Sequence, residues 1–117
     1  MKLQISALAR RDIKKILGYS RRSYGAEAMA RYSELLTAAM LDVTKNPMLL
    51  GSHGVKDMPD IRAYPIAHST GGIAAAVRVQ NPAHKLIYKL FPGGMTVIVS
   101  VVGMSYPAEL ALKPARP

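Results

Sequence analysis

The stretch AEAMARYSELLTAAMLDVTK, residues 26–45, predicts the most regular element of this chain, an amphipathic helix. Its apolar side chains recur every three or four residues: Ala28, Met29, Tyr32, Leu35, Leu36, Ala39, Met40 and Val43. This spacing places them on one helical face, which must pack against the rest of the protein. Asn46-Pro47 is expected to end the helix, because a residue that precedes proline disfavours helical backbone.

Another amphipathic helix is expected just before it, over residues 7–24. Ser6 is a residue type that caps helix N-termini, and Gly25 is typical of a helix end. Two amphipathic helices with so short a connection must lie antiparallel and share an apolar seam. Residues 2–6 are expected to form the first strand of the mature fold rather than part of a signal peptide, because their apolar run is short and charged residues follow at once.

After Pro47, glycines and prolines divide the chain into short runs rich in Val, Ile and Tyr, which is typical of strands. Strands are expected near residues 61–67, 73–80, 84–91 and 95–102. Pro92-Gly93-Gly94 predicts that the last two strands form an antiparallel hairpin. The predicted fold class is therefore α+β: an N-terminal strand, and an antiparallel helical hairpin packed on one face of an antiparallel β-sheet.

Length and composition restrict the classes of protein that remain. The 117 residues, 1–117, fit one domain with a single core. The absence of cysteine excludes a disulfide scaffold and a thiol nucleophile. No apolar run approaches the roughly 18 residues of a membrane span. These features favour a cytoplasmic protein with no membrane association.

The charge balance points to an acidic partner. Lysines and arginines number 16 against 7 acidic residues, which gives a formal net charge of +9. The basic residues are spread along the chain and form no tail, so they belong to folded surfaces. Such a surface attracts nucleic acid or an acidic polypeptide, and the alternative is a basic surface that is only solvated.

The polar residues that are able to carry chemistry lie on two of the predicted strands. The 3 histidines have no metal-binding spacing, so neither a metal site nor a cofactor is expected. The candidate residues are Arg62, Tyr64, His68, His84, Lys85, Tyr88 and Lys89. If the strands pair, these cations and hydroxyls gather on a sheet face, where they can hold a phosphodiester and stabilise its transition-state charge. The alternative is structural: solvated lysines and core tyrosines with hydrated hydroxyl groups.

The order of several short motifs resembles a known family. They are Leu3-x-Ile5-Ser6-x-x-Ala9-x-x-Asp12-Ile13-x-x-Ile16-x-x-Tyr19, Tyr24-Gly25, Asn46-Pro47, Val55-Lys56-Asp57-Met58, Ile61-Arg62-x-Tyr64 and Pro82-x-His84-Lys85-Leu86-Ile87-Tyr88-Lys89. Together they resemble ParE-type toxins of the RelE/ParE superfamily of bacterial toxin–antitoxin systems. Each motif alone is common, whereas their order and spacing over nearly the whole chain are specific.

The resemblance implies a single RelE/ParE-like domain with a curved antiparallel sheet. Compared with smaller members, residues 69–81 are expected to form an extended hairpin, and residues 107–117 a short, frayed tail. It further implies a toxin neutralised by a cognate acidic antitoxin, in systems of plasmid maintenance and growth arrest. Operator DNA is then contacted only indirectly, through the antitoxin. The antitoxin-binding candidates are Arg10, Lys14, Arg21 and Arg22.

The target divides the superfamily. The ParE-like alternative is an inhibitor that binds DNA gyrase and blocks replication, with no catalytic residue of its own. Its target-binding candidates are Arg62, Tyr64, His68, Lys85 and Lys89. The RelE-like alternative is a ribosome-dependent mRNA endonuclease that uses Arg62, Lys85, Tyr88 and Lys89. Departures from the family pattern at Lys89 and Gly103 leave a third reading, an inactive homologue that acts only in operon regulation.

Overall fold

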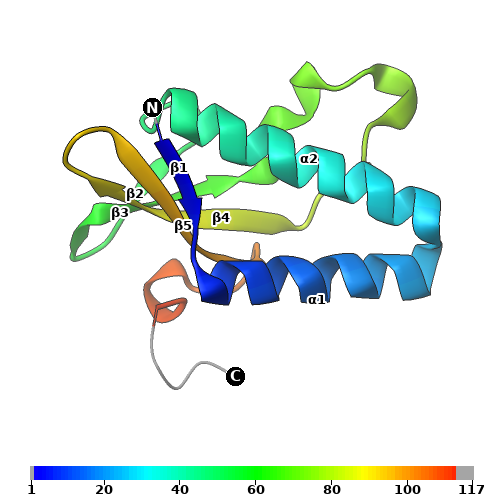
Figure 1. Cartoon of the computed structure of the whole chain (residues 1–117), viewed down its shortest axis with the longest axis horizontal. Helices are drawn as coiled ribbons and strands as arrows, with labels where there is room; N and C mark the ends of the chain where they lie inside the picture. The colour runs from blue at the N-terminus through cyan, green and yellow to red at the C-terminus, as the bar shows by residue number, and fades with distance from the viewer. Residues whose placement is uncertain (1, 113–117) are drawn as a thin grey trace.

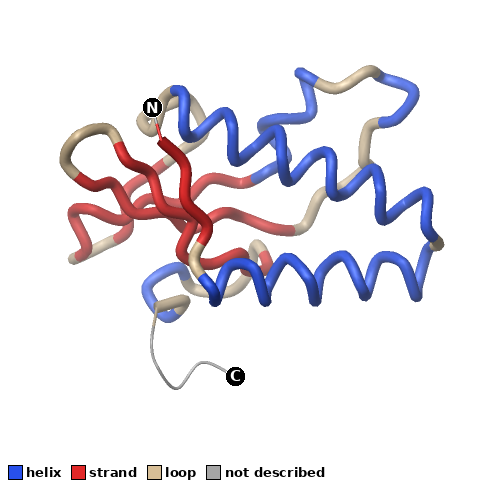
Figure 2. Tube along the Cα trace, viewed as in Figure 1, coloured by secondary structure: helices blue, strands red, loops and turns tan. Residues whose placement is uncertain are grey.

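The computed structural model describes residues 2–112 of the chain. Its elements are β1 (Lys2–Ile5), α1 (Ala7–Tyr24), α2 (Ala26–Lys45), β2 (His53–Val55), β3 (Met58–Pro65), β4 (His84–Phe91), β5 (Met95–Gly103) and the short 3₁₀ helices η1 (Ile66–Gly72), η2 (Ala75–Val77) and η3 (Ala108–Leu110). The two long helices run side by side and cover one face of the sheet (Figures 1 and 2). This is the predicted α+β architecture.

Local signals in the sequence explain the helical hairpin. Ser6 caps α1, because its Oγ accepts a hydrogen bond of 3.0 Å from the backbone N–H of Ala9. Gly25 alone separates the two helices and has a φ of +97°, a conformation that other residues rarely adopt. The chain therefore reverses within one residue, and the predicted hairpin of residues 7–24 and 26–45 is confirmed.

The sheet is mixed rather than purely antiparallel, in the order β1-β5-β4-β3-β2. Strands β2 to β5 pair with antiparallel neighbours, whereas β1 pairs in parallel with β5. The prediction of an antiparallel sheet was wrong for this one pair. The helical hairpin carries the chain from β1 to the opposite edge of the sheet, and the meander that returns from there ends with β5 running in the direction of β1.

The segment between β3 and β4 also differs from the prediction. Residues 73–80 form no strand and residues 69–81 no hairpin, and the 3₁₀ helices η1 and η2 occupy this region instead. Arg78 closes the segment into a compact loop, because its Nε donates a hydrogen bond of 2.7 Å to the carbonyl of Ile73. Strand β3 already pairs with β2 on one side and with β4 on the other. Residues 73–80 therefore find no free strand edge beside β3.

Apolar side chains fill both sides of the sheet. The larger cluster lies between the helices and the sheet, and a smaller one lies on the far face. Residues 106–112 cover part of that far face, with Ala108 and Ala111 buried against Ile87 and Val102. The predicted tail therefore packs on the fold as far as residue 112, and its remainder lies outside the described residues. No helix among residues 2–112 is long and apolar enough to cross a membrane.

Candidate functional site

The two strands that carry the polar candidates do pair, but their side chains point to opposite faces. In the β3–β4 ladder, Arg62 lies opposite Tyr88 and Tyr64 opposite Leu86. Tyr64, Tyr88 and Leu86 pack in the helix-facing cluster, whereas Ile87 packs in the far one. Since side chains alternate along a strand, Lys85 and Lys89 share the far face with Ile87. The predicted gathering on one face therefore does not occur.

Arg62 and Tyr88 hold the loop that follows α2. The Arg62 Nε and the Tyr88 hydroxyl both donate to the carbonyl of Pro47, at 3.1 and 2.6 Å. The Arg62 Nη2 also donates to Ser52 Oγ at 2.8 Å. Burial raises the pKa of Tyr88, so its hydroxyl keeps its proton at neutral pH. These contacts fasten residues 47–52 at both ends, with the Leu50 side chain 97% exposed between them.

Tyr64 belongs to a second internal network. Its hydroxyl is 2.8 Å from Ser69 Oγ, which donates to a carboxylate oxygen of Asp42 at 2.7 Å. Burial raises the pKa of Tyr64 as well. His68 is exposed and lies beside both Tyr64, at 5.8 Å between ring centroids, and Gly51. A Cβ at Gly51 would meet the His68 ring at 2.8 Å, so only glycine fits this contact.

The two lysines on the far face have different partners. Lys85 is buried, and its Nζ donates a hydrogen bond of 3.2 Å to the carbonyl of Met104. The Nζ of Lys89 lies 5.0 Å from the centroid of the Phe91 ring, a cation–π contact. Neither ammonium group faces Arg62, Tyr64 or Tyr88 across the sheet.

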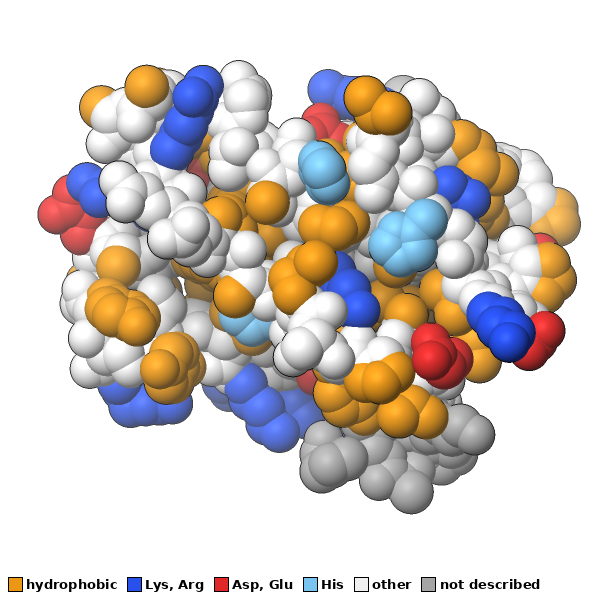
Figure 3. All heavy atoms as spheres, turned by 180° about the vertical axis from the view of Figure 1, so that it is seen from behind, with side chains coloured by type: hydrophobic (Ala, Val, Ile, Leu, Met, Phe, Trp, Pro, Cys, Tyr) orange, Lys and Arg blue, Asp and Glu red, His pale blue; other side chains and the backbone are white. Residues whose placement is uncertain are grey.

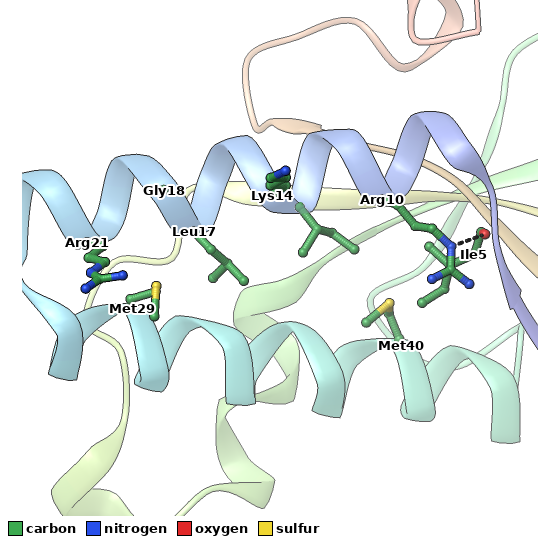
Figure 4. Close-up of a pocket in the computed structure, with 9 residues that line it drawn as sticks. Ile5, Arg10, Lys14, Leu17, Gly18, Arg21, Met29 and Met40 are labelled. Atoms are coloured by element: carbon green, nitrogen blue, oxygen red, sulfur yellow. Dashed lines mark hydrogen bonds between the residues drawn. The ribbon is translucent and has the colours of Figure 1, made fainter.

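A groove of about 540 Å³ runs between α1 and α2. Apolar side chains from both helices, Leu17, Met29 and Met40, line it together with basic residues of α1 (Figure 4). Three of the four predicted antitoxin contacts belong to this lining: Arg10, Lys14 and Arg21. Arg22 does not line the groove, and its guanidinium lies over Gly18. The groove thus combines an apolar floor with a basic side.

Other features restrict the chemistry of the described surface. Among residues 2–112, no group of three or more His, Asp or Glu side chains is placed to hold a metal ion. Seen from behind, the Lys and Arg side chains form separate groups rather than one continuous patch (Figure 3). The basic charge on this face is therefore not concentrated as it is in the stripe of a typical nucleic-acid-binding surface.

Sequence reasoning missed two features of the site. Leu50 lay in a stretch with no regular periodicity, and nothing in the sequence indicates that residues 47–52 would be fastened at both ends. Asp12 was noted only within a motif. Its carboxylate accepts hydrogen bonds of 3.0 Å from Ser100 Oγ and the Val101 N–H, which joins α1 to β5. The signal that could have indicated these contacts is the position of Asp12, a lone acidic residue on the apolar side of its helix.

No protein-family model and no curated protein matches the sequence. A solved structure, a YoeB/ParE toxin from Agrobacterium tumefaciens, matches with a TM-score of 0.56 and 18% sequence identity. The match covers 88% of this chain and 98% of that one. The chain therefore has the fold of that toxin over nearly its whole described length, as the motif resemblance implied.

Proposed function

We propose that this chain is the toxin of a toxin–antitoxin pair and that it inhibits DNA gyrase by binding it. The likeness in fold to a YoeB/ParE toxin is the observation that carries the toxin assignment. The choice of gyrase rests on the ParE-like order of motifs along the chain, from Leu3-x-Ile5-Ser6 to the strand that ends at Lys89.

The placement of the polar residues supports inhibition by binding rather than cleavage of RNA. Metal-free cleavage of a phosphodiester requires a base, an acid and a cation within reach of the same phosphate. Here the Arg62 and Tyr88 side chains are engaged with Pro47 on the helix-facing side. Lys85 and Lys89 lie on the other face of β4. One phosphate cannot contact both sets.

The loop of residues 47–52 is the proposed target-binding element. Leu50 is 97% and Met48 64% exposed, although both are large apolar side chains. The hydrogen bonds of Arg62 to both Pro47 and Ser52 hold the loop, which lowers the entropy that it would lose on binding. His68 beside Gly51 extends the same surface. Arg62 and Tyr88 then act as positioning residues for this loop.

The groove between α1 and α2 is the proposed antitoxin site. Its apolar floor fits one face of an amphipathic segment, and Arg10, Lys14 and Arg21 fit acidic side chains along that segment. The occupant is therefore an acidic amphipathic stretch of the antitoxin. This assignment agrees with the net charge of +9.

The target is tested by gyrase supercoiling and DNA-cleavage assays with the purified chain. The expected result is loss of supercoiling with accumulation of cleaved DNA. Leu50→Ser should raise the concentration needed for inhibition about tenfold, as for an interface anchor, with an unchanged fold. Leu110→Ser, which changes an exposed leucine outside the loop of residues 47–52, is the control and should leave inhibition as it was. Full supercoiling at excess protein would refute the gyrase assignment.

The antitoxin site is tested by a growth-rescue assay with the antitoxin of the same operon. Lys14→Glu reverses a charge that lines the groove and should prevent rescue. Lys15→Glu makes the same change at the next, exposed residue outside the groove and should leave rescue intact. Equal rescue of both variants would place the antitoxin elsewhere.

A further inference from the structure

A second hollow lies at the far end of the helical hairpin and has no part in the proposed function. It has a volume of about 640 Å³ and lies between α1, α2 and residues 78–84. Its lining includes the aromatic and basic residues Tyr19, Tyr24, Arg31, Tyr32, Arg78 and His84. None of the lining residues is acidic. Its size is that of cavities that bind small organic molecules.

The two arginines of the hollow have unused capacity for an anion. The Arg31 Nε is buried without a hydrogen-bond partner among residues 2–112, and a buried donor left unpaired costs free energy. The Nη2 of the same side chain pairs at 2.6 Å with Glu27, whose carboxylate is 80% exposed. Arg78 donates to the main-chain carbonyls of Ile73 and Gly71, and no acidic residue of the described chain pairs with it.

One wall of the hollow is fixed by hydrogen bonds. The Tyr32 hydroxyl accepts from the Ala83 N–H at 3.2 Å and lies 2.6 Å from Nδ1 of His84. Burial lowers the pKa of His84, so the ring is neutral at pH 7. The Tyr32 hydroxyl and Nδ1 are hydrogen-bonded in either tautomer of the neutral ring. This contact joins α2 to the start of β4.

The outer wall is aromatic. The rings of Tyr19 and Tyr24 are 59% and 72% exposed and meet edge to face, with centroids 6.4 Å apart. Exposed aromatic faces beside arginines are the combination with which proteins stack nucleobases and hold their phosphates. Core tyrosines would be buried, whereas these two rings lie in solvent.

We propose that this hollow binds a nucleoside monophosphate, with the base against Tyr19 and Tyr24 and the phosphate on Arg31 and Arg78. A phosphate would meet the exposed part of the Arg31 side chain, which is 39% exposed, because the Nε atom itself is buried. The same chemistry is presented by a free nucleotide and by the 5′-phosphorylated end of an RNA. The inference does not depend on whether gyrase is the target.

Calorimetric titration of the full chain with AMP, adenosine and inorganic phosphate tests the ligand class. AMP should bind at least about tenfold more tightly than either fragment, since the hollow contacts both of its parts. A 5′-phosphorylated oligoribonucleotide that displaces AMP would identify an RNA end as the ligand. Failure to displace it would identify the free nucleotide. The absence of AMP binding, or equal binding of phosphate and AMP, would overturn the proposal.

Matched variants locate the binding. Arg31→Gln should weaken AMP binding about tenfold or more, as the loss of a charge-assisted hydrogen bond does. Arg11→Gln removes the same charge from an exposed position outside the hollow and should leave binding unchanged. Tyr19→Leu should weaken AMP and leave the affinity for phosphate unaltered. Equal loss in the Arg11 and Arg31 variants would mean general charge attraction and would contradict a site.

Discussion

The two faces of the sheet use similar side chains in different ways. On the helix-facing side, Arg62, Tyr64 and Tyr88 each make hydrogen bonds within the fold, to Pro47, Ser52 and Ser69. On the far side, Lys85 makes one bond to a carbonyl and Lys89 lies over an aromatic ring. The first face is fastened by polar contacts, whereas the second is covered in part by residues 106–112.

This difference shows that the fold places the two sets of cations and hydroxyls on opposite faces of the sheet. Strand alternation separates the two sets by the thickness of the sheet, so they cannot act on one substrate. The polar groups of the first face give the loop of residues 47–52 its position. Under the proposed function the chain inhibits by binding, and the following changes test the contrast between the faces.

The largest effect is expected for Arg62→Ala. It removes hydrogen bonds to Pro47 and Ser52, and the free energy of unfolding should fall by about 2–3 kcal/mol. Urea denaturation measures this change, with Arg11→Ala, at an exposed position, as the control. If Arg62→Ala abolishes gyrase inhibition at unchanged stability, Arg62 contacts the target directly and the contrast between the faces fails.

Tyr88→Phe should destabilise the fold by about 1–1.5 kcal/mol. The variant keeps the buried ring and loses only the hydrogen bond from the hydroxyl to the carbonyl of Pro47. The midpoint of thermal unfolding is a sufficient measurement. A stability equal to that of the natural chain would mean that Arg62 alone holds the loop.

Lys85→Met should leave stability unchanged or raise it by up to about 1 kcal/mol. The ammonium group is buried with one carbonyl partner, so its removal ends a desolvation cost while the side chain keeps nearly the same volume. Chemical denaturation of this variant beside Tyr88→Phe compares the two faces directly. A loss of more than about 2 kcal/mol would show that the far face is also fastened by a polar contact.

His84 predicts a modest dependence of stability on pH. Burial lowers its pKa in the folded chain below the ordinary value of 6.5, so the unfolded chain binds the proton more readily. Stability should therefore fall as the pH decreases from above 6.5 through the folded pKa. His84→Gln should flatten this part of the profile, measured as unfolding free energy against pH. An unchanged profile in the variant would assign the dependence to other groups.

The smallest effect is expected for Lys89→Ala. An exposed cation–π contact contributes about 0.5–1 kcal/mol, and this one links only Lys89 and Phe91. If gyrase inhibition is lost while stability is nearly unchanged, the far face is part of the target surface.

Local patterns predicted the helices well. The spacing of apolar residues, the Ser6 cap and Gly25 act within a few residues, and the structure has the helices at Ala7–Tyr24 and Ala26–Lys45. These signals are properties of one element alone.

What sequence reasoning missed depends on contacts between distant segments. The parallel pairing of β1 with β5 follows from where the meander ends, and residues 73–80 lack a strand partner there. The role of Arg62 follows from the position of Pro47, which lies 15 residues away in the chain. No short-range pattern contains this information.

The most direct test of inhibition by binding is to express the chain in growing bacteria without an antitoxin and to examine chromosomal DNA and mRNA from the same culture. Inhibition by binding predicts gyrase-dependent DNA breaks with intact mRNA, because Lys85 and Lys89 lie on the opposite face of the sheet from Arg62 and Tyr88. Cleaved mRNA with intact DNA would contradict it, and would show that the cations and hydroxyls of the two faces act together.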